Sequence, residues 1–204
     1  MQIIWYGQNC FKIISPEVTI LTDPLSPQKV GLKNPKIGNE GIIIFSSVEE
    51  KKITPPNNFV VFTPGEYEIK NVLIYGLPHF EGKSLKTIYQ LDIEEIKVCF
   101  LGEISQKPKD EELEKLGKIN ILILPVSGKK TISPQEAAEV VNEIQPNLII
   151  PSGWQDEKEL LPFIKKTGIK KEAIVDKLKI KKKDFSDEKI RFFILRPLGS
   201  KANE

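Results

Sequence analysis

The hydrophobic pattern of the sequence changes at Pro108, and this change constrains the fold more than any other feature. Before it, short apolar and β-branched runs are separated by turn-forming pairs such as Asp23-Pro24 and Pro64-Gly65. This pattern is typical of an antiparallel-rich sheet. We therefore predict strands over residues 3–6, 11–14, 18–22, 42–45, 59–62, 66–69, 72–77, 87–93 and 97–101.

After Pro108 the pattern alternates between helix and strand. The clearest helix start is a capping box, with Ser133 as N-cap, Pro134 at the first helical position and Glu136 three residues after the cap. Helices are predicted over 109–116, from 134 to before Pro146, and over 156–167, and strands over 119–126, 148–151 and 191–195. Two sheets with helices outside them would use all these elements, so the predicted class is α/β. We expect one domain over residues 1–198 and a frayed tail over 199–204.

The charge balance and the apolar runs exclude several classes of protein. The 204 residues carry 30 basic and 28 acidic side chains, and the net charge of +2 gives no global field that would attract nucleic acid or an anionic membrane. The longest apolar runs are far shorter than the roughly 20 residues that span a bilayer. The N-terminus has neither a basic segment nor a long apolar one, so we interpret it as a first strand rather than a secretion signal.

The number and sequence context of the cysteines predict the redox environment of the protein. Cys10 and Cys99 each lie in an apolar run, where a free cysteine usually behaves as a small buried hydrophobe. Buried structural thiols are therefore favoured over nucleophiles, and a reducing cytoplasm is the expected location.

A lysine-dense segment, residues 165–183, raises the possibility of phosphate binding. The segment lacks arginine and interleaved surface aromatic residues, and we predict that Ile174, Leu178 and Ile180 are core positions between solvated lysines. A nucleic-acid partner is therefore disfavoured.

Histidine is nearly absent, which restricts any metal chemistry. A catalytic zinc usually takes two or three neutral imidazoles, and a two-metal site takes more. The sequence contains one histidine, His79, and two cysteines. It therefore cannot assemble a His-rich hydrolytic zinc site, wherever these residues lie in space.

The order of several motifs resembles a known family. The motifs are Gly7-Gln8-Asn9-Cys10-Phe11, Leu21-Thr22-Asp23-Pro24, Pro64-Gly65-Glu66-Tyr67-Glu68, Cys99-Phe100-Leu101-Gly102, Pro125-Val126-Ser127-Gly128 and Ile150-Pro151. In order and spacing they resemble the metallo-β-lactamase-fold hydrolases, in particular the branch of ascorbate-6-phosphate lactonase. The resemblance covers nearly the whole chain, and it implies a four-layer αββα sandwich with a metal site at one edge, formed by loops at strand ends.

The resemblance also implies where metal ligands would stand, and this sequence has other residues there. Gln8 stands in place of an imidazole, Glu103 in place of the bridging aspartate and Gly153 in place of the last histidine. The segment 47–52 replaces the His-x-His-x-Asp-His motif, and Glu81 replaces a further histidine. The predicted vestigial pocket consists of Gln8, Asp23, Ser47, Glu49, Lys51, Lys52, His79, Glu81, Glu103, Gly153 and Trp154.

Two lysines in this segment suggest how the fold could do without metals. Lys51 and Lys52 would place positive charge where the family holds divalent cations. We hypothesise that they pair with Glu49, Glu103 or Asp23 and so replace the metals with internal salt bridges.

Other interpretations of the same residues remain open. The carboxylates Glu49, Glu81 and Glu103 could form an all-oxygen site for magnesium, manganese or calcium, although loop carboxylates are usually solvated. His79 could be a ligand or a general base, although a lone histidine in a turn is more often an ordinary hydrogen-bonding residue. Trp154 could fill the space vacated by metals or form the wall of a small-molecule pocket.

The leading interpretation is a non-catalytic binding, regulatory or scaffold protein without a metal cofactor. The alternative is a hydrolase of phosphoester or lactone substrates that uses one divalent cation, such as magnesium, manganese or zinc, in an altered carboxylate site. A homo-oligomer is expected only by analogy with relatives. The sequence identifies no physiological ligand or partner.

Overall fold

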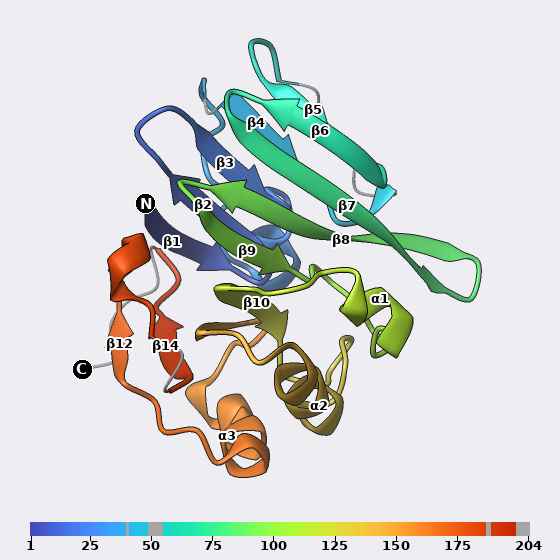
Figure 1. Cartoon of the computed structure of the whole chain (residues 1–204), viewed down its shortest axis with the longest axis vertical. Helices are drawn as coiled ribbons and strands as arrows, with labels where there is room; N and C mark the ends of the chain where they lie inside the picture. The colour runs from blue at the N-terminus through green and yellow to red at the C-terminus, as the bar shows by residue number, and fades with distance from the viewer. Residues whose placement is uncertain (40, 49–54, 187–188, 199–204) are drawn as a thin grey trace.

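Figure 1 shows the computed structural model, which describes residues 1–39, 41–48, 55–186 and 189–198. The described residues form two stacked β-sheets, and buried apolar side chains from both sheets join in one core cluster. The helices α1 (Asp110–Glu114), α2 (Pro134–Ile144) and α3 (Leu161–Thr167) lie on the side of the second sheet, with α2 against its strand β10 (Ile121–Pro125). The arrangement agrees with the predicted α/β sandwich.

The first sheet has six strands in the order β13-β1-β2-β3-β4-β5. Their bounds are β1 Gln2–Gly7, β2 Cys10–Ile14, β3 Thr19–Thr22, β4 Gly41–Ile44, β5 Phe59–Val61 and β13 Lys177–Lys179. Buried and partly exposed residues alternate along β1, as expected for a strand with one face on the core. Strands β1 to β3 pair antiparallel as predicted, whereas β3, β4 and β5 pair in parallel.

The second sheet has eight strands in the order β12-β14-β11-β10-β9-β8-β7-β6. The remaining bounds are β6 Gly65–Ile69, β7 Val72–Glu81, β8 Ser84–Ile93, β9 Ile96–Phe100, β11 Leu148–Ser152, β12 Ala173–Val175 and β14 Arg191–Leu195. Every residue of β10 and β11 is buried, which confirms the prediction of strands covered on both faces. Strands β9, β10 and β11 are parallel, and β6 to β9 are antiparallel.

Capping residues and helix-terminating residues in the sequence predicted most of the helices correctly. The Ser133 hydroxyl accepts a hydrogen bond from the Glu136 nitrogen at 3.2 Å, and the Glu136 carboxylate accepts one from the Ser133 nitrogen at 2.7 Å, so the predicted capping box is present. The helix predicted over 156–167 is divided into a 3₁₀ helix, η3 (Glu157–Leu160), and α3. Two further 3₁₀ helices, η1 (Pro27–Val30) and η4 (Lys182–Asp184), were not predicted.

The structure departs from the sequence expectations at two other places. Strands β12 and β13 lie inside the lysine-dense segment, where no strand was predicted. Leu178 and Ile180 are buried as expected, and Ile174 is only partly buried. The β7–β8 hairpin is longer than predicted, because both strands continue to a turn after Glu81. No described helix is long and apolar enough to cross a membrane.

Candidate functional site at the strand-end edge

Four strand ends and one turn meet at one edge of the sandwich, which we call the strand-end edge. It consists of the residues that follow β3, β4, β9 and β11, together with the turn between β1 and β2. Parallel pairing brings the carboxyl ends of β3 and β4 to one side of the first sheet, and those of β9 and β11 to one side of the second. Gln8, Asp23, Ser47, Glu103 and Gly153 all lie on these segments.

Asp23 is held by Ser46 across the first sheet. Its side chain is buried, and its two carboxylate oxygens accept hydrogen bonds from the Ser46 backbone nitrogen at 2.7 Å and the Ser46 hydroxyl at 2.6 Å. Gly102, after β9, packs on the same serine, since a Cβ added to Gly102 would lie 2.3 Å from Ser46 Cβ. Asp23 therefore joins β3 to β4, and the contact between Ser46 and Gly102 joins the first sheet to the second.

Asn9 makes a second connection between the sheets. Its side-chain oxygen accepts a hydrogen bond from the Ser152 hydroxyl at the end of β11, at 3.1 Å. Its backbone nitrogen donates to the Ser26 hydroxyl at 3.2 Å, and its backbone oxygen accepts from the Thr22 hydroxyl at 2.7 Å. All four residues are buried, so these bonds satisfy polar groups that would otherwise be costly to bury.

Gln8 contributes to this edge through its backbone. Its φ of 50° turns its carbonyl oxygen toward two donors, the Trp5 indole nitrogen at 2.8 Å and the Gly153 backbone nitrogen at 3.3 Å. The Trp5 and Trp154 rings lie 4.7 Å apart between centroids, at an angle of 38°, and Trp154 is 5% exposed. The indole rings therefore fill the interior between β1 and the end of β11.

Two lysines reach the strand-end edge, and neither was identified from the sequence. Lys29 Nζ lies 2.5 Å from Glu103 Oε2, and Lys86 Nζ donates a hydrogen bond to the Ser47 hydroxyl at 3.3 Å. Lys29 comes from η1 and Lys86 from β8, 74 and 39 residues from their partners. No local sequence signal connects positions so far apart, so only the fold reveals these contacts.

His79 and Glu81 belong to a neighbouring polar cluster in the β7–β8 hairpin. His79 is 3% exposed, with Nδ1 at 3.1 Å from Glu112 Oε2 of α1 and Nε2 at 3.6 Å from Glu81 Oε1. Glu81 also accepts hydrogen bonds from the backbone nitrogens of Ser105 and Gln106. The expectation that His79 lies in a turn is wrong, because β7 continues through it. Contacts with Glu112 could not be foreseen from one sequence.

Three residues of the predicted pocket, Glu49, Lys51 and Lys52, lie outside the described residues. The hypothesis that these lysines pair with nearby carboxylates therefore stays a prediction. Within the described ranges, Glu103 pairs with Lys29, and Asp23 bonds to Ser46. Among the same residues, no group of three or more His, Cys, Asp or Glu side chains is arranged to hold a metal ion.

Both cysteines are buried. Burial raises the pKa of the Cys99 thiol, and burial together with the Asp23 carboxylate raises the pKa of the Cys10 thiol well above its ordinary value. Both thiols are therefore protonated at neutral pH and pack as small apolar groups, as their sequence context predicted.

Comparison with known proteins decides the family. The family model described as the β-lactamase superfamily domain matches residues 2–152. The chain belongs to this superfamily. A UPF0173 protein of Pyrococcus abyssi (strain GE5 / Orsay) is 23% identical to this superfamily member over 174 residues, which are 74% of this chain and 82% of that protein. A UPF0173 protein of Pyrococcus furiosus is 33% identical over 78 residues, 38% of this chain and 36% of that protein.

Solved structures give the same result for the fold. The crystal structure of a proposed Zn-dependent hydrolase of the metallo-β-lactamase superfamily from Thermotoga maritima matches with a TM-score of 0.77 and 25% identity, over 96% of this chain and 99% of that chain. The metallo-β-lactamase fold protein YhfI from Bacillus subtilis matches with a TM-score of 0.64 and 9% identity, over 96% of both chains. The predicted metallo-β-lactamase fold is therefore confirmed.

Proposed function

We propose that this superfamily member is a non-catalytic binding or scaffold protein whose metal site has been lost. The observation that carries the proposal is the ion pair between Lys29 and Glu103, in which the nitrogen and oxygen lie 2.5 Å apart. Glu103 stands where the family resemblance implies a carboxylate that bridges two metal ions. An ammonium group at this carboxylate occupies the place of a cation, and it would repel a dication brought close to it.

The other implied ligand positions supply poor donors for a metal. Gly153 has no side chain, is buried and has φ of 71°, a backbone conformation in which a histidine would be strained. Gln8 offers an amide where an imidazole is implied, and Ser47 offers a hydroxyl that is bonded to Lys86. Catalytic zinc sites use histidine, cysteine or carboxylate ligands, so these described residues do not fit one.

The three remaining candidates among the described residues, Asp23, His79 and Glu81, each have a bonding partner within the protein; Glu81 accepts hydrogen bonds from Ser105 and Gln106. Both oxygens of Asp23 accept hydrogen bonds from Ser46, and the Nδ1 atom of His79 lies at hydrogen-bond distance from Glu112. The Asp23 carboxylate is therefore satisfied within the protein, whereas the buried Nε2 atom of His79 has no hydrogen-bond partner among the described residues and lies 3.6 Å from Glu81 Oε1. This arrangement supports a protein that kept the fold of a hydrolase family for another use.

Metal content is the measurement that tests the proposal. Untagged protein is dialysed against zinc, manganese or magnesium, and bound metal is measured by mass spectrometry. We expect a stoichiometry near zero for all three metals and no chelator-sensitive lactonase or phosphodiesterase activity. Near-stoichiometric metal that is lost in Glu103→Ala, together with chelator-sensitive hydrolysis, would instead establish the alternative carboxylate-based hydrolase.

A pair of lysine variants sharpens this test. Lys29→Met removes the ammonium group beside Glu103, and Lys36→Met removes an exposed lysine of the neighbouring loop as a matched control. If the ammonium group is what replaces the metal, Lys29→Met should bind more metal than the wild type, and Lys36→Met should bind no more than the wild type. Equal uptake by the wild type and both variants at high stoichiometry would contradict the proposed role of Lys29.

A further inference from the structure

Two free strand edges at opposite ends of the sandwich carry opposite charges. Strand β6 is the last strand of the second sheet, and its exposed residues are Glu66 and Glu68. Strand β13 is the last strand of the first sheet, and its exposed residues are Lys177 and Lys179. In the part of the chain that the structure describes, none of these four side chains forms an ion pair. Among the described residues, these four charges therefore have no oppositely charged partner.

The backbone of β6 is available for pairing at the acidic residues. The β6–β7 hairpin has a two-residue turn, Lys70 and Asn71, both with positive φ, so the flanking pair Ile69 and Val72 is hydrogen-bonded across the two strands. Hydrogen-bonded residues alternate with outward-facing ones along an antiparallel pair. The backbone N–H and C=O groups of Glu66 and Glu68 therefore point away from β7, toward the free edge.

The backbone of β13 is available at its basic residues for the same reason. Ile180 and Met1 exchange two hydrogen bonds, at 3.1 Å and 2.9 Å, so this pair is the hydrogen-bonded kind. The alternation then turns the backbone groups of Leu178 toward β1 and those of Lys177 and Lys179 toward the free edge. On both strands, the residues whose backbone N–H and C=O groups point toward the sheet edge are therefore also the residues with exposed charged side chains.

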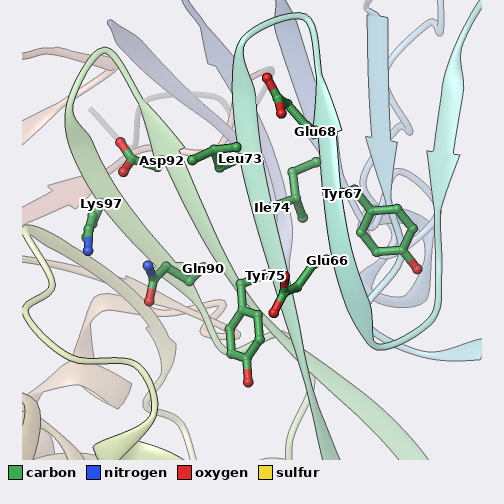
Figure 2. Close-up of a pocket in the computed structure, with 9 residues that line it drawn as sticks. All are labelled: Glu66, Tyr67, Glu68, Leu73, Ile74, Tyr75, Gln90, Asp92 and Lys97. Atoms are coloured by element: carbon green, nitrogen blue, oxygen red, sulfur yellow. The ribbon is translucent and has the colours of Figure 1, made fainter.

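A groove on the face of the second sheet, lined by residues of β6, β7, β8 and β9, gives room for the side chains of a strand that pairs with β6. It has a volume of about 430 Å³, and Figure 2 shows Glu66 and Glu68 on the groove side of β6, with Tyr67 pointing the other way. Asp92 adds a third carboxylate to the lining, against one lysine, Lys97. The groove therefore favours cationic side chains.

We propose that the occupant of the β6 edge is the β13 edge of a second copy of this chain. Antiparallel pairing of the two strands places Glu66 opposite Lys179 and Glu68 opposite Lys177, with the salt-bridging side chains on one face. Pairing of either edge with itself would instead oppose like charges, which is destabilising. The interface is head-to-tail, and the resulting dimer keeps one unpaired β6 edge on one copy and one unpaired β13 edge on the other, so association continues beyond a dimer. This inference goes beyond the proposed function, and no residue of the strand-end edge takes part in it.

The test is sedimentation velocity of the full chain over a range of protein concentrations at about 0.05 M and about 0.5 M sodium chloride. We expect the average mass to rise with concentration at low salt and the rise to weaken at high salt. Glu66→Lys with Glu68→Lys, and separately Lys177→Glu with Lys179→Glu, should each weaken association by about tenfold or more, because each variant opposes like charges. An equimolar mixture of the two double variants should restore association, because their charges are again complementary.

Controls separate this interface from general charge effects. Glu111→Lys with Glu114→Lys makes the same change in net charge on exposed positions of α1, and it should associate as the wild type does. Circular dichroism of each variant shows whether it is folded. A wild type that stays monomeric at low salt would overturn the proposal. So would loss of association in the β6 variant alone, because another segment would then occupy the acidic edge.

Discussion

The strand-end edge and the free edges of β6 and β13 use polar residues in opposite ways. At the strand-end edge, Asp23 is buried and bonded to Ser46, which follows β4, and Asn9 is buried and bonded to Ser152 of β11. At the free edges, Glu66 and Lys177 are exposed, and neither forms an ion pair among the described residues. The first pattern stabilises the fold, and the second leaves charge available to another molecule. Hydrogen bonds within the chain therefore satisfy Asp23 and Asn9 at the strand-end edge, whereas the exposed charges of the two free edges have no such bonds among the described residues.

The largest expected effect comes from Asp23, which anchors the strand-end edge. Asp23→Ala leaves two buried donors of Ser46 without an acceptor, and it should lower the free energy of unfolding by about 3–5 kcal/mol. Ser46→Ala removes only one donor and should lower it by about 2 kcal/mol. Urea denaturation of both variants measures the difference. A loss below about 1 kcal/mol in Asp23→Ala would mean that this carboxylate is not a structural anchor.

A second prediction concerns Gly102, which allows the two sheets to approach at Ser46. Gly102→Ala introduces a Cβ 2.3 Å from Ser46 Cβ at a residue with φ of 67°, and it should lower the free energy of unfolding by about 3 kcal/mol. Gly82→Ala is the matched control, because Gly82 has φ of 62° and no atom within 4 Å of the added Cβ. The control should cost about 1 kcal/mol, from backbone strain alone. Equal losses in denaturation experiments would contradict close packing at this edge.

The fold was easier to predict from the sequence than the contacts within the site. Hydrophobic periodicity and turn residues act over a few positions, so they indicated most strands and the helix that begins after Ser133. The ion pair of Lys29 with Glu103 and the contact of Gly102 with Ser46 join positions far apart in the chain, and no periodicity encodes them. The sequence could name Gln8, Glu103 and Gly153 only because motifs resembling a family marked their positions.

The errors in the prediction have physical causes. No strand was predicted in the lysine-dense segment, although Leu178 was expected in the core, because one buried side chain between two lysines is too short a pattern to indicate a strand. His79 was expected in a turn because Pro78 precedes it, but proline is tolerated in β7, where its missing N–H costs little at an exposed position.

A third prediction compares the long-range network with a local one, the capping box of α2. Hydrogen bonds from the side chain and backbone of Ser133 lower the pKa of Glu136 below its ordinary value of 4.5. Ser133→Ala should lower the free energy of unfolding at neutral pH by about 1 kcal/mol, less than Asp23→Ala, because a cap bond is partly exposed.

The pH dependence of the same capping box follows from the direction of this pKa shift. A carboxyl group with a lowered folded-state pKa stabilises the protein above its ordinary pKa, and the contribution is lost as pH falls through the lowered value. The difference in unfolding free energy between the wild type and Glu136→Ala should therefore shrink as the pH falls below the ordinary pKa of 4.5. Thermal unfolding monitored by circular dichroism measures it. A difference that grows in acid would contradict the capping role of Glu136.

The smallest expected effect on the free energy of unfolding comes from the charges of the free edges. It decides whether the free edges differ from the strand-end edge as described. Because Glu66 and Glu68 have exposed side chains and no internal ion pair among the described residues, Glu66→Lys with Glu68→Lys should change the free energy of unfolding of the monomer by less than about 0.5 kcal/mol. Lys177→Glu with Lys179→Glu should behave in the same way. Denaturation at low protein concentration and high salt isolates the monomer from association. If either variant lost more than about 1 kcal/mol, the edge charges would have a structural role like that of Asp23, and the distinction between the two regions would fail. If the unfolding free energy of the monomer is unchanged and association is lost, these charges act between copies of the chain. The buried contacts of the strand-end edge act only within one copy.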